Sequence, residues 1–213
     1  MPTTAAIIGT GGLGSAIARR LASGGETLRL SSADTESART LAATIGRAAV
    51  VAVDNRDAVQ DADAVVLALR FTVLEGVIDE IADALAGKLV VVPSNPVGLD
   101  SEGKVKRLLP KGQPSGEVLA GWLPAGTRLA MAFGTMTADL LESSGSRSPE
   151  PAVLFYATDD DRAAQEVERL IRTAGFAPVK VGGVKQSGRL EVGGDLHDLI
   201  VSPAAGRSLI GGP

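Results

Sequence analysis

The chain has 213 residues, with 21 Lys and Arg against 25 Asp and Glu, a formal net charge of −4. This mildly acidic balance argues against nucleic acid or an anionic membrane surface as a partner. The chain contains no cysteine, which excludes disulfides, thiolate metal ligands and cysteine nucleophiles. We therefore expect no metal site, and a small-molecule redox substrate as the partner.

The first residues, MPTTAAII, lack the basic and long apolar regions of a secretory signal. No apolar run approaches the ~20 residues that span a bilayer. These features predict a cytoplasmic protein. With one His, one Tyr and one Trp, the chain has few groups for acid–base catalysis, so we expect its chemistry to depend on a cofactor.

Strand and helix patterns alternate along the chain, which predicts an α/β fold of the Rossmann type with a doubly wound, mainly parallel sheet. Strands are expected at residues 5–9, 27–32, 49–53, 64–69, 88–96, 127–133, 151–157 and 177–181. Helices are expected after the first strand and over residues 35–45, 56–61, 74–85, 117–123 and 160–174.

We expect one domain over residues 1–200, which includes a small C-terminal portion from about residue 150. Residues 97–126 have a loose pattern that predicts mostly loop, and residues 182–201 resist assignment because glycines interrupt them. Residues 201–213 are predicted to form a flexible tail. The apolar, glycine-rich C-terminal segment would also allow a homodimer.

Three glycines, Gly9, Gly11 and Gly14, follow the first strand at the G-x-G-x-x-G spacing and open a helix. In this context the first glycine allows a tight turn, the second lets the backbone approach a pyrophosphate, and the third lets the helix pack on the strand. The helix N-terminus offers unpaired N–H groups to the phosphates. The loop therefore predicts a dinucleotide-binding site.

The end of the second strand distinguishes NADP from NAD, because an acid there binds the ribose hydroxyls of NAD. The strand ends in Ser31 and Ser32, which favours NADP. Asp34 lies about twenty residues beyond Gly14, where a ribose ligand is expected, so NAD remains an alternative. We favour the other interpretation of Asp34, the N-cap of the next helix.

Five segments together resemble the NADP oxidoreductase, coenzyme F420-dependent family, from about Thr4 to Leu199. They are IIGTGGLGSAIARRLASGGETLRLSSAD, DADAVVLALRF, KLVVVPSNPVG, RLAMAFGTM and GFAPVKVGGVKQSGRLEVGGDL. The resemblance implies a Rossmann-type fold and hydride transfer between NADP(H) and a deazaflavin. It also implies the residues that contact the nucleotide. These are the loop Gly9, Thr10, Gly11, Gly12, Leu13 and Gly14, the strand end at Ser31 and Ser32, and a nicotinamide site at Leu69, Arg70, Phe71, Asn95, Pro96, Ala132 and Phe133.

The chain departs from the family pattern at several of these positions. The usual Ser-Arg pair after the second strand is Ser32-Ala33, and a usual Pro after the fourth strand is Arg70. Near the nicotinamide, the family's Lys and Asn are replaced by Met131 and Gly134. The loss of these polar side chains leaves the hydride acceptor open.

Other polar residues are weaker candidates. Asn95 and Pro96 follow the fifth strand at the edge where ligands bind in such sheets, and we favour a ligand contact over the alternative, a simple Asn-Pro turn. His197 lies near two aspartates and is a weak catalytic candidate. Lys104, Lys106, Arg107 and Lys111 form a cluster that would suit an anionic substrate, but a solvated surface is the more common role of such a cluster.

The sequence therefore predicts an NADP(H)-dependent oxidoreductase, with coenzyme F420 or a flavin as the candidate second redox partner. Two alternatives remain open. One is a reductase of a small imine or carbonyl compound, which would need a proton donor. The other is a redox sensor that binds NADP without catalysis.

Overall fold

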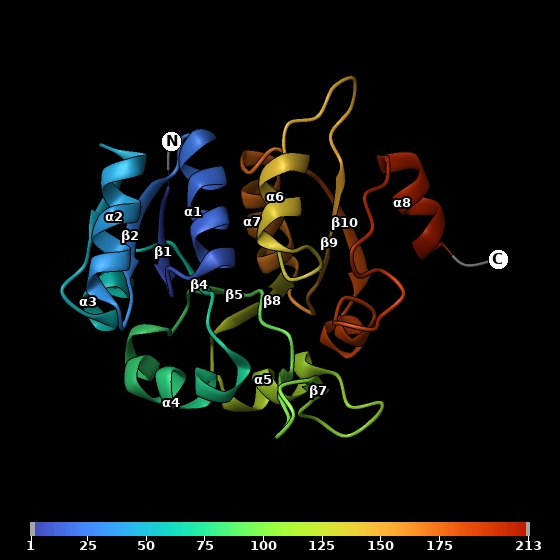
Figure 1. The fold of residues 1–213 in the computed structure, drawn as a ribbon, viewed down its shortest axis with the longest axis horizontal. Coiled ribbons are helices and arrows are strands. Elements are labelled where there is room, and N and C mark those ends of the chain that lie inside the picture. Colours follow the sequence, from blue (N-terminus) through green and yellow to red (C-terminus); the bar gives the residue numbers. More distant parts are fainter. Residues whose placement is uncertain (1–2, 212–213) are drawn as a thin grey trace.

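The computed structural model describes residues 3–211 and contains a central sheet between two layers of helices (Figure 1). Eight strands form this sheet in the order β10-β9-β8-β5-β4-β1-β2-β3. They are β1 (Thr4–Ile8), β2 (Thr27–Ser31), β3 (Ala49–Val51), β4 (Ala64–Leu67), β5 (Leu89–Val92), β8 (Arg128–Ala132), β9 (Val153–Ala157) and β10 (Ala177–Gly182). The predicted Rossmann-type α/β class is confirmed.

The helices cover both faces of the sheet. Core residues of one face come from α1 (Gly12–Ser23), α2 (Thr35–Ile45), α6 (Ala138–Ser144) and α7 (Asp161–Thr173). The other face packs against α3 (Asn55–Gln60), α4 (Phe71–Ile81), α5 (Ser115–Trp122), the 3-10 helix η2 (Val184–Arg189) and α8 (Pro203–Ile210). A short 3-10 helix, η1 (Ala82–Ala84), follows α4.

The apolar strands are buried because helices cover both sides of the sheet. In β1, Ala5 and Ile7 belong to the core cluster on one face, and Ala6 and Ile8 to the cluster on the other. All four side chains are at most 1% exposed. The alternation of side chains along a strand thus accounts for a run without polar residues.

All neighbouring strands from β3 to β8 are parallel, so their carboxyl ends meet at one edge of the sheet. The chain then reverses, and β9 runs antiparallel to β8, with Met131 opposite Ala157. β10 is parallel to β9. The reversal brings the C-terminal segment back to the edge where β5 and β8 end.

Two expectations need correction. The segment 97–126 contains, besides α5, a hairpin of β6 (Val97–Leu99) and β7 (Val105–Arg107). The predicted tail is wrong for residues 203–210, which form α8. Ser202 caps this helix by accepting the N–H of Ala205, and Pro203 occupies its first turn, which are ordinary helix-start signals. The last two residues of the predicted tail lie outside the described residues.

Within residues 3–211, no helix combines the length and the apolar character that crossing a membrane requires.

The packing of α8 can be tested by placing a methyl group on Gly206. A Cβ there would lie 2.7 Å from Cγ2 of Val153, whereas a Cβ on Gly76, inside α4, meets nothing within 4 Å. We expect Gly206→Ala to lower the free energy of unfolding by about 1–3 kcal/mol through overpacking. Gly76→Ala should instead raise it by about 0.5–1 kcal/mol. Denaturant unfolding of both variants measures the difference, and equal effects would contradict the packing of α8.

Candidate nucleotide-binding site

The glycine loop has the geometry that a pyrophosphate-binding turn needs. Gly9 has a φ of +99°, and a Cβ there would collide with the carbonyl oxygen of Ala68. A Cβ on Gly14 would collide with the carbonyl oxygen of Gly9, so α1 packs directly on the turn. A Cβ on Gly11, the N-cap of α1, meets nothing within 4 Å. The three glycines therefore serve a turn, a close contact and an open approach to the helix N-terminus.

An open crevice of about 280 Å³ begins at this loop and crosses the carboxyl ends of β4 and β5. The expected nucleotide contacts Gly11, Gly12, Leu13, Gly14, Leu69, Arg70, Phe71 and Asn95 all line it. The ring of Phe71 packs against the ring of Trp122, with 5.4 Å between the two ring centroids. Among the described residues, the exposed Arg70 has no carboxylate within salt-bridge distance, so its charge is available to the crevice.

Most polar side chains at the end of β2 already have partners. Ser31 is buried and donates to Oδ1 of Asn55 at 2.7 Å. Thr10, also buried, shares a hydrogen bond of 2.8 Å with the hydroxyl of Ser37. Ser32 is half-buried, and its hydroxyl accepts only a long bond from the Asp34 N–H. Of the expected contacts Thr10, Ser31 and Ser32, only Ser32 has a hydroxyl that donates no hydrogen bond to another described residue.

Asp34 is the N-cap of α2. One of its carboxylate oxygens accepts the N–H groups of Glu36 and Ser37 at 3.1 and 3.3 Å. The structure thus supports the capping interpretation over a role as ribose ligand.

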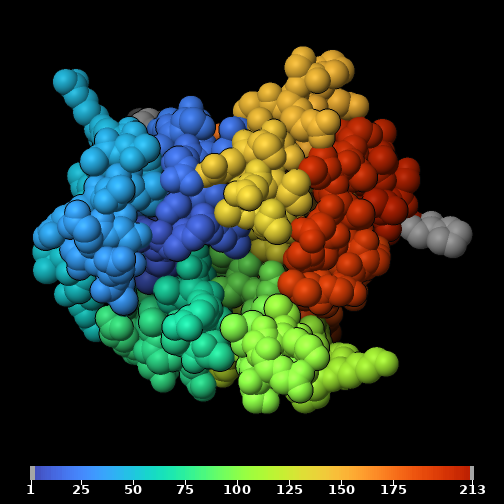
Figure 2. All heavy atoms as spheres, in the orientation of Figure 1, coloured from blue at the N-terminus to red at the C-terminus, as the bar shows by residue number. Residues whose placement is uncertain are grey.

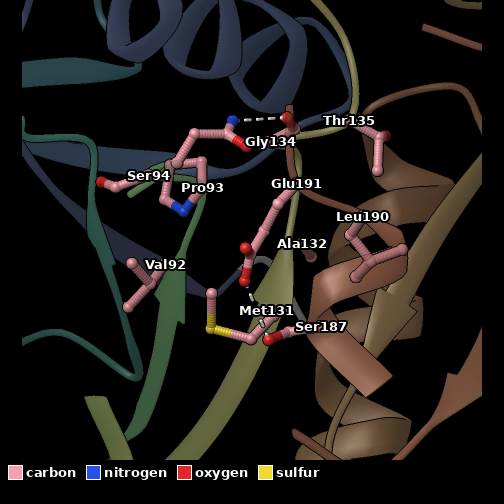
Figure 3. Close-up of a pocket in the computed structure, with 11 residues that line it drawn as sticks. Val92, Pro93, Ser94, Met131, Ala132, Gly134, Thr135, Ser187, Leu190 and Glu191 are labelled. Atoms are coloured by element: carbon pink, nitrogen blue, oxygen red, sulfur yellow. Dashed lines mark hydrogen bonds between the residues drawn. The ribbon is translucent and has the colours of Figure 1, made fainter. Parts of the chain in front are cut away.

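A second, smaller pocket adjoins the crevice between the ends of β5 and β8 (Figure 3). Its free space is about 20 Å³, enough for about one water-sized group. Figure 3 shows side chains of Val92, Met131, Leu190 and Glu191 around it. Apolar groups thus form much of its wall, and Glu191 brings a carboxylate.

Asn95 connects the walls of this pocket. Its Nδ2 donates to the carbonyl of Gly134 at 2.9 Å, and its Oδ1 accepts the N–H of Val192 at 2.7 Å. The side chain therefore joins the end of β5 to the segment after β8 and to the C-terminal segment. Asn95 is at the edge of the crevice, as expected, but most of its hydrogen-bonding capacity is used to hold the site together.

The Glu191 carboxylate is 4% exposed and has four polar partners. Its Oε1 accepts the N–H and the hydroxyl of Ser115 at 2.7 Å each, and the hydroxyl of Ser187 at 3.3 Å. Its Oε2 accepts from Arg107 at 2.6 Å. Through these bonds Glu191 ties β7 and α5 to η2.

Gly134 lies in this pocket because only glycine fits there. A Cβ on Gly134 would collide with the carbonyl oxygen of Pro93. The ends of β5 and β8 therefore approach each other too closely here for the Asn expected from the family pattern. Met131 and Ala132, also in the pocket wall, are nearly buried.

Two of the expected nicotinamide contacts, Phe133 and Pro96, lie away from both pockets. Phe133 has a φ of +67° and its ring is fully buried in the core beside α1, α6 and α7, away from both pockets. The left-handed backbone turns this side chain toward the core. Pro96 is buried at the start of the hairpin, where its carbonyl accepts the N–H of Leu108, and it lines neither pocket.

The acid–base candidates lie outside the crevice. The Nδ1 atom of His197 is 3.1 Å from a carboxylate oxygen of Asp198, and His197 lines neither pocket. Tyr156 donates to Glu168 at 2.6 Å, and burial together with this hydrogen bond raises the pKa of its phenol. Neither side chain is placed to transfer a proton in the crevice.

Several pocket residues were not predicted from the sequence, namely Thr135, Ser187, Leu190 and Glu191. The last three lie in the glycine-interrupted segment that has no clear periodicity. Their position depends on the reversal of chain direction at β9, which the nearby sequence does not predict.

A Rossmann domain with this glycine loop belongs to the class of NAD(P)-binding domains. Residues 4–96 match the family model described as NADP oxidoreductase, coenzyme F420-dependent, which confirms the resemblance over this segment. A comparison with curated protein sequences gives no match.

Several solved structures share this fold over most of this chain's length. A hypothetical protein, SMa0349 from Sinorhizobium meliloti, is 28% identical with a TM-score of 0.81, covering 95% of this chain and 96% of that one. A protein from Arthrobacter sp. FB24, described as a candidate F420-dependent NADP reductase, is 20% identical with a TM-score of 0.76, covering 88% of each chain. A variant imine reductase from Myxococcus stipitatus, in complex with NAD+, is 22% identical with a TM-score of 0.65. It covers 91% of this chain and 60% of that one.

The close approach at Gly134 predicts that the family's residue will not be tolerated there. We expect Gly134→Asn to lower the free energy of unfolding by about 3 kcal/mol, because the Pro93 backbone must move. Gly87→Asn is the matched control, since Gly87 has a φ of +72°, which Asn tolerates, and open space around it. Chemical denaturation of the two variants checks this, and an unchanged stability of Gly134→Asn would contradict the close approach.

Proposed function

We propose that this chain is an NADP(H)-dependent oxidoreductase that transfers a hydride between the nicotinamide and a second redox partner. The geometry of the glycine loop carries the proposal, because Gly11 leaves the N-terminus of α1 open to a pyrophosphate. The crevice then leads from this loop to the small pocket beside β5 and β8.

The residues present fit a dinucleotide. The loop 9–14 would hold the pyrophosphate, Ser32 the ribose phosphate, and Leu69, Phe71 and Ala132 the nicotinamide side. The cofactor would supply the hydride. The chain's own contribution is to position two rings and to exclude water, for which the apolar side chains Leu69, Phe71 and Met131 are suited.

The preference for NADP rests on the matched family and on the end of β2. No acid is free at the strand end to bind the ribose hydroxyls, since Asp34 caps α2. The chain lacks the guanidinium that the family's Ser-Arg pair provides, so we expect Ser32 alone to give a weaker phosphate site.

Two acceptors have support. A deazaflavin or flavin is favoured by the family matched over residues 4–96, and its ring would lie over the open crevice. A small imine or carbonyl compound is suggested by the likeness in fold to an imine reductase, but the small pocket has room for only about one water-sized group, so such a substrate would lie in the open crevice. That second reaction needs a proton donor, and His197, the candidate from the sequence, lines neither pocket.

Gly11→Ala tests the nucleotide site without disturbing the fold. The new Cβ has no protein neighbour within 4 Å, so we expect the melting temperature of the free protein to change little. The methyl group would occupy the path of the pyrophosphate, and the stabilisation by NADPH should fall by about 1–3 kcal/mol. Thermal shift with NADPH measures this loss. If NADPH stabilises the variant and the unmodified chain equally, the pyrophosphate does not bind at this loop.

Ala33→Arg restores the family's pair and tests the cofactor preference. A guanidinium at this exposed position should tighten NADPH binding about tenfold, as expected for a charge-assisted hydrogen bond, and leave NADH binding unchanged. Calorimetric titration of both cofactors checks the difference. Tighter binding of NADH than NADPH by the unmodified chain would refute the proposed preference.

Turnover with [4-²H]-labelled NADPH distinguishes the acceptors. Deuterium should be retained at C5 of F420 or at the reduced carbon of a cyclic imine. Reduction of a flavin is followed instead by the loss of its visible absorbance, because a deuteron on flavin N5 exchanges with water. Binding of NADPH without transfer to any of them would favour the redox sensor. Turnover of an imine that persists in His197→Ala would exclude His197 as the proton donor.

A further inference from the structure

A pocket of about 420 Å³ lies beside the site described above, where the segment of β7 and α5 meets η2. In Figure 2 the lime-green β7–α5 segment lies directly below the red C-terminal segment. Four cations line this cationic pocket, and no acidic residue is among its lining residues. They are Arg107, Lys111, Lys185 and Arg189. A concentration of positive charge is unusual for a chain with a net charge of −4.

The two arginines are neutralised by carboxylates that lie outside the pocket wall. Arg107 donates to the buried Glu191, and Arg189 donates to Asp195 at 2.7 Å. The hydrogen bond from Arg189 holds the pKa of the Asp195 carboxyl below its usual range. These pairs fix both guanidinium groups in place.

The two lysines carry the uncompensated charge. Among the described residues, Lys111 has no carboxylate within 4.0 Å, and Lys185 reaches Glu117 only at 4.0 Å. Both side chains are exposed. In the described part of the chain Lys111 is therefore unpaired and Lys185 has one long pairing with Glu117, so the pocket presents about one to two net positive charges toward the solvent.

Glycines expose the backbone between these cations. Gly112 and Gly193 have φ values of +84° and +87°, with open space where a side chain would stand. Within residues 3–211 the N–H of Gly193 has no hydrogen-bond partner. Free backbone N–H groups beside cations form a concave site for an anion.

The cationic pocket is joined to the proposed catalytic crevice by direct contacts. Arg107 on its wall binds Glu191 on the wall of the small pocket. Val192, also on its wall, donates to Asn95 at the crevice. These contacts place the cationic pocket directly beside the small pocket and the crevice, so the far end of a molecule bound in the crevice would lie next to it.

From this arrangement we propose that the cationic pocket binds a carboxylate or phosphate group of the second substrate. This inference rests on the proposed function, which places the reacting end of that substrate in the crevice. Lys111 and Lys185 supply the attraction, and the paired arginines and the Gly193 N–H supply the directed hydrogen bonds. The second substrate is therefore anionic.

Amide NMR spectra of the ¹⁵N-labelled chain test the site with inorganic pyrophosphate and, separately, with citrate. We expect saturable shifts of the Gly112 and Gly193 amides, and the tighter of the two probes indicates phosphate or carboxylate as the ligand group. The double variant K111E/K185E should weaken binding at these amides about tenfold or more. Shifts that are absent with both probes, or that persist in this variant, would overturn the proposal.

The control variant K104E/K106E makes the same change in charge on neighbouring residues that do not line the pocket. It should leave the Gly112 and Gly193 shifts within about twofold of those of the unmodified chain. A loss equal to that of K111E/K185E would mean that the pocket acts only through general charge, against the proposal. Amides of the sheet core report whether each variant remains folded.

FMN and riboflavin link the site to the second substrate, because they share one ring system and differ by a phosphate. In the presence of NADPH we expect the unmodified chain to bind FMN about tenfold more tightly than riboflavin. We expect K111E/K185E to bind the two molecules with equal affinity. Equal binding to the unmodified chain would overturn the assignment to the second substrate. A failure of NADPH to shift the Gly11 and Gly12 amides would instead refute the proposed function, and the pyrophosphate shifts at Gly112 and Gly193 would still decide the anion site.

Discussion

The contact between the turn after β1 and the first turn of α1 is the constraint on which the rest of the site depends. Gly9 and Gly14 each leave no room for a Cβ, so the helix begins directly against the turn and against the end of β4. Because the parallel strands end at a common edge, this contact also sets the floor of the crevice along β4 and β5. The helix N-terminus is thereby presented to a ligand with little freedom to move.

Local pattern was sufficient to predict the part of the fold that local rules govern. The glycine spacing, the apolar strands and the Asp34 cap follow from turn geometry, burial and helix capping, and all three appear in the structure. Phe133 shows where such rules end, because its direction depends on a left-handed backbone that no neighbouring residue signals. Glu191 is a second case, since its burial results from contacts with residues more than seventy positions away.

Polar residues at the edge of the sheet divide into two groups. Thr10, Ser31 and Asn95 form hydrogen bonds with other protein groups and hold the loops in place. Ser32 and Arg70 retain capacity for a ligand. A list of polar residues near a strand end therefore overstates the number of ligand contacts, because the loops themselves need polar partners to be rigid.

The reversal of the chain at β9 has a consequence for how such a protein changes during evolution. The proposed nucleotide site lies within residues 4–96, whereas much of the wall of the small pocket comes from residues 131–135 and 187–191. The two halves meet along the paired strands β5 and β8 and through the side chain of Asn95. Mutations after residue 96 can thus change the small pocket while the glycine loop stays intact. The same loop could therefore be kept while the protein evolves to act on different substrates.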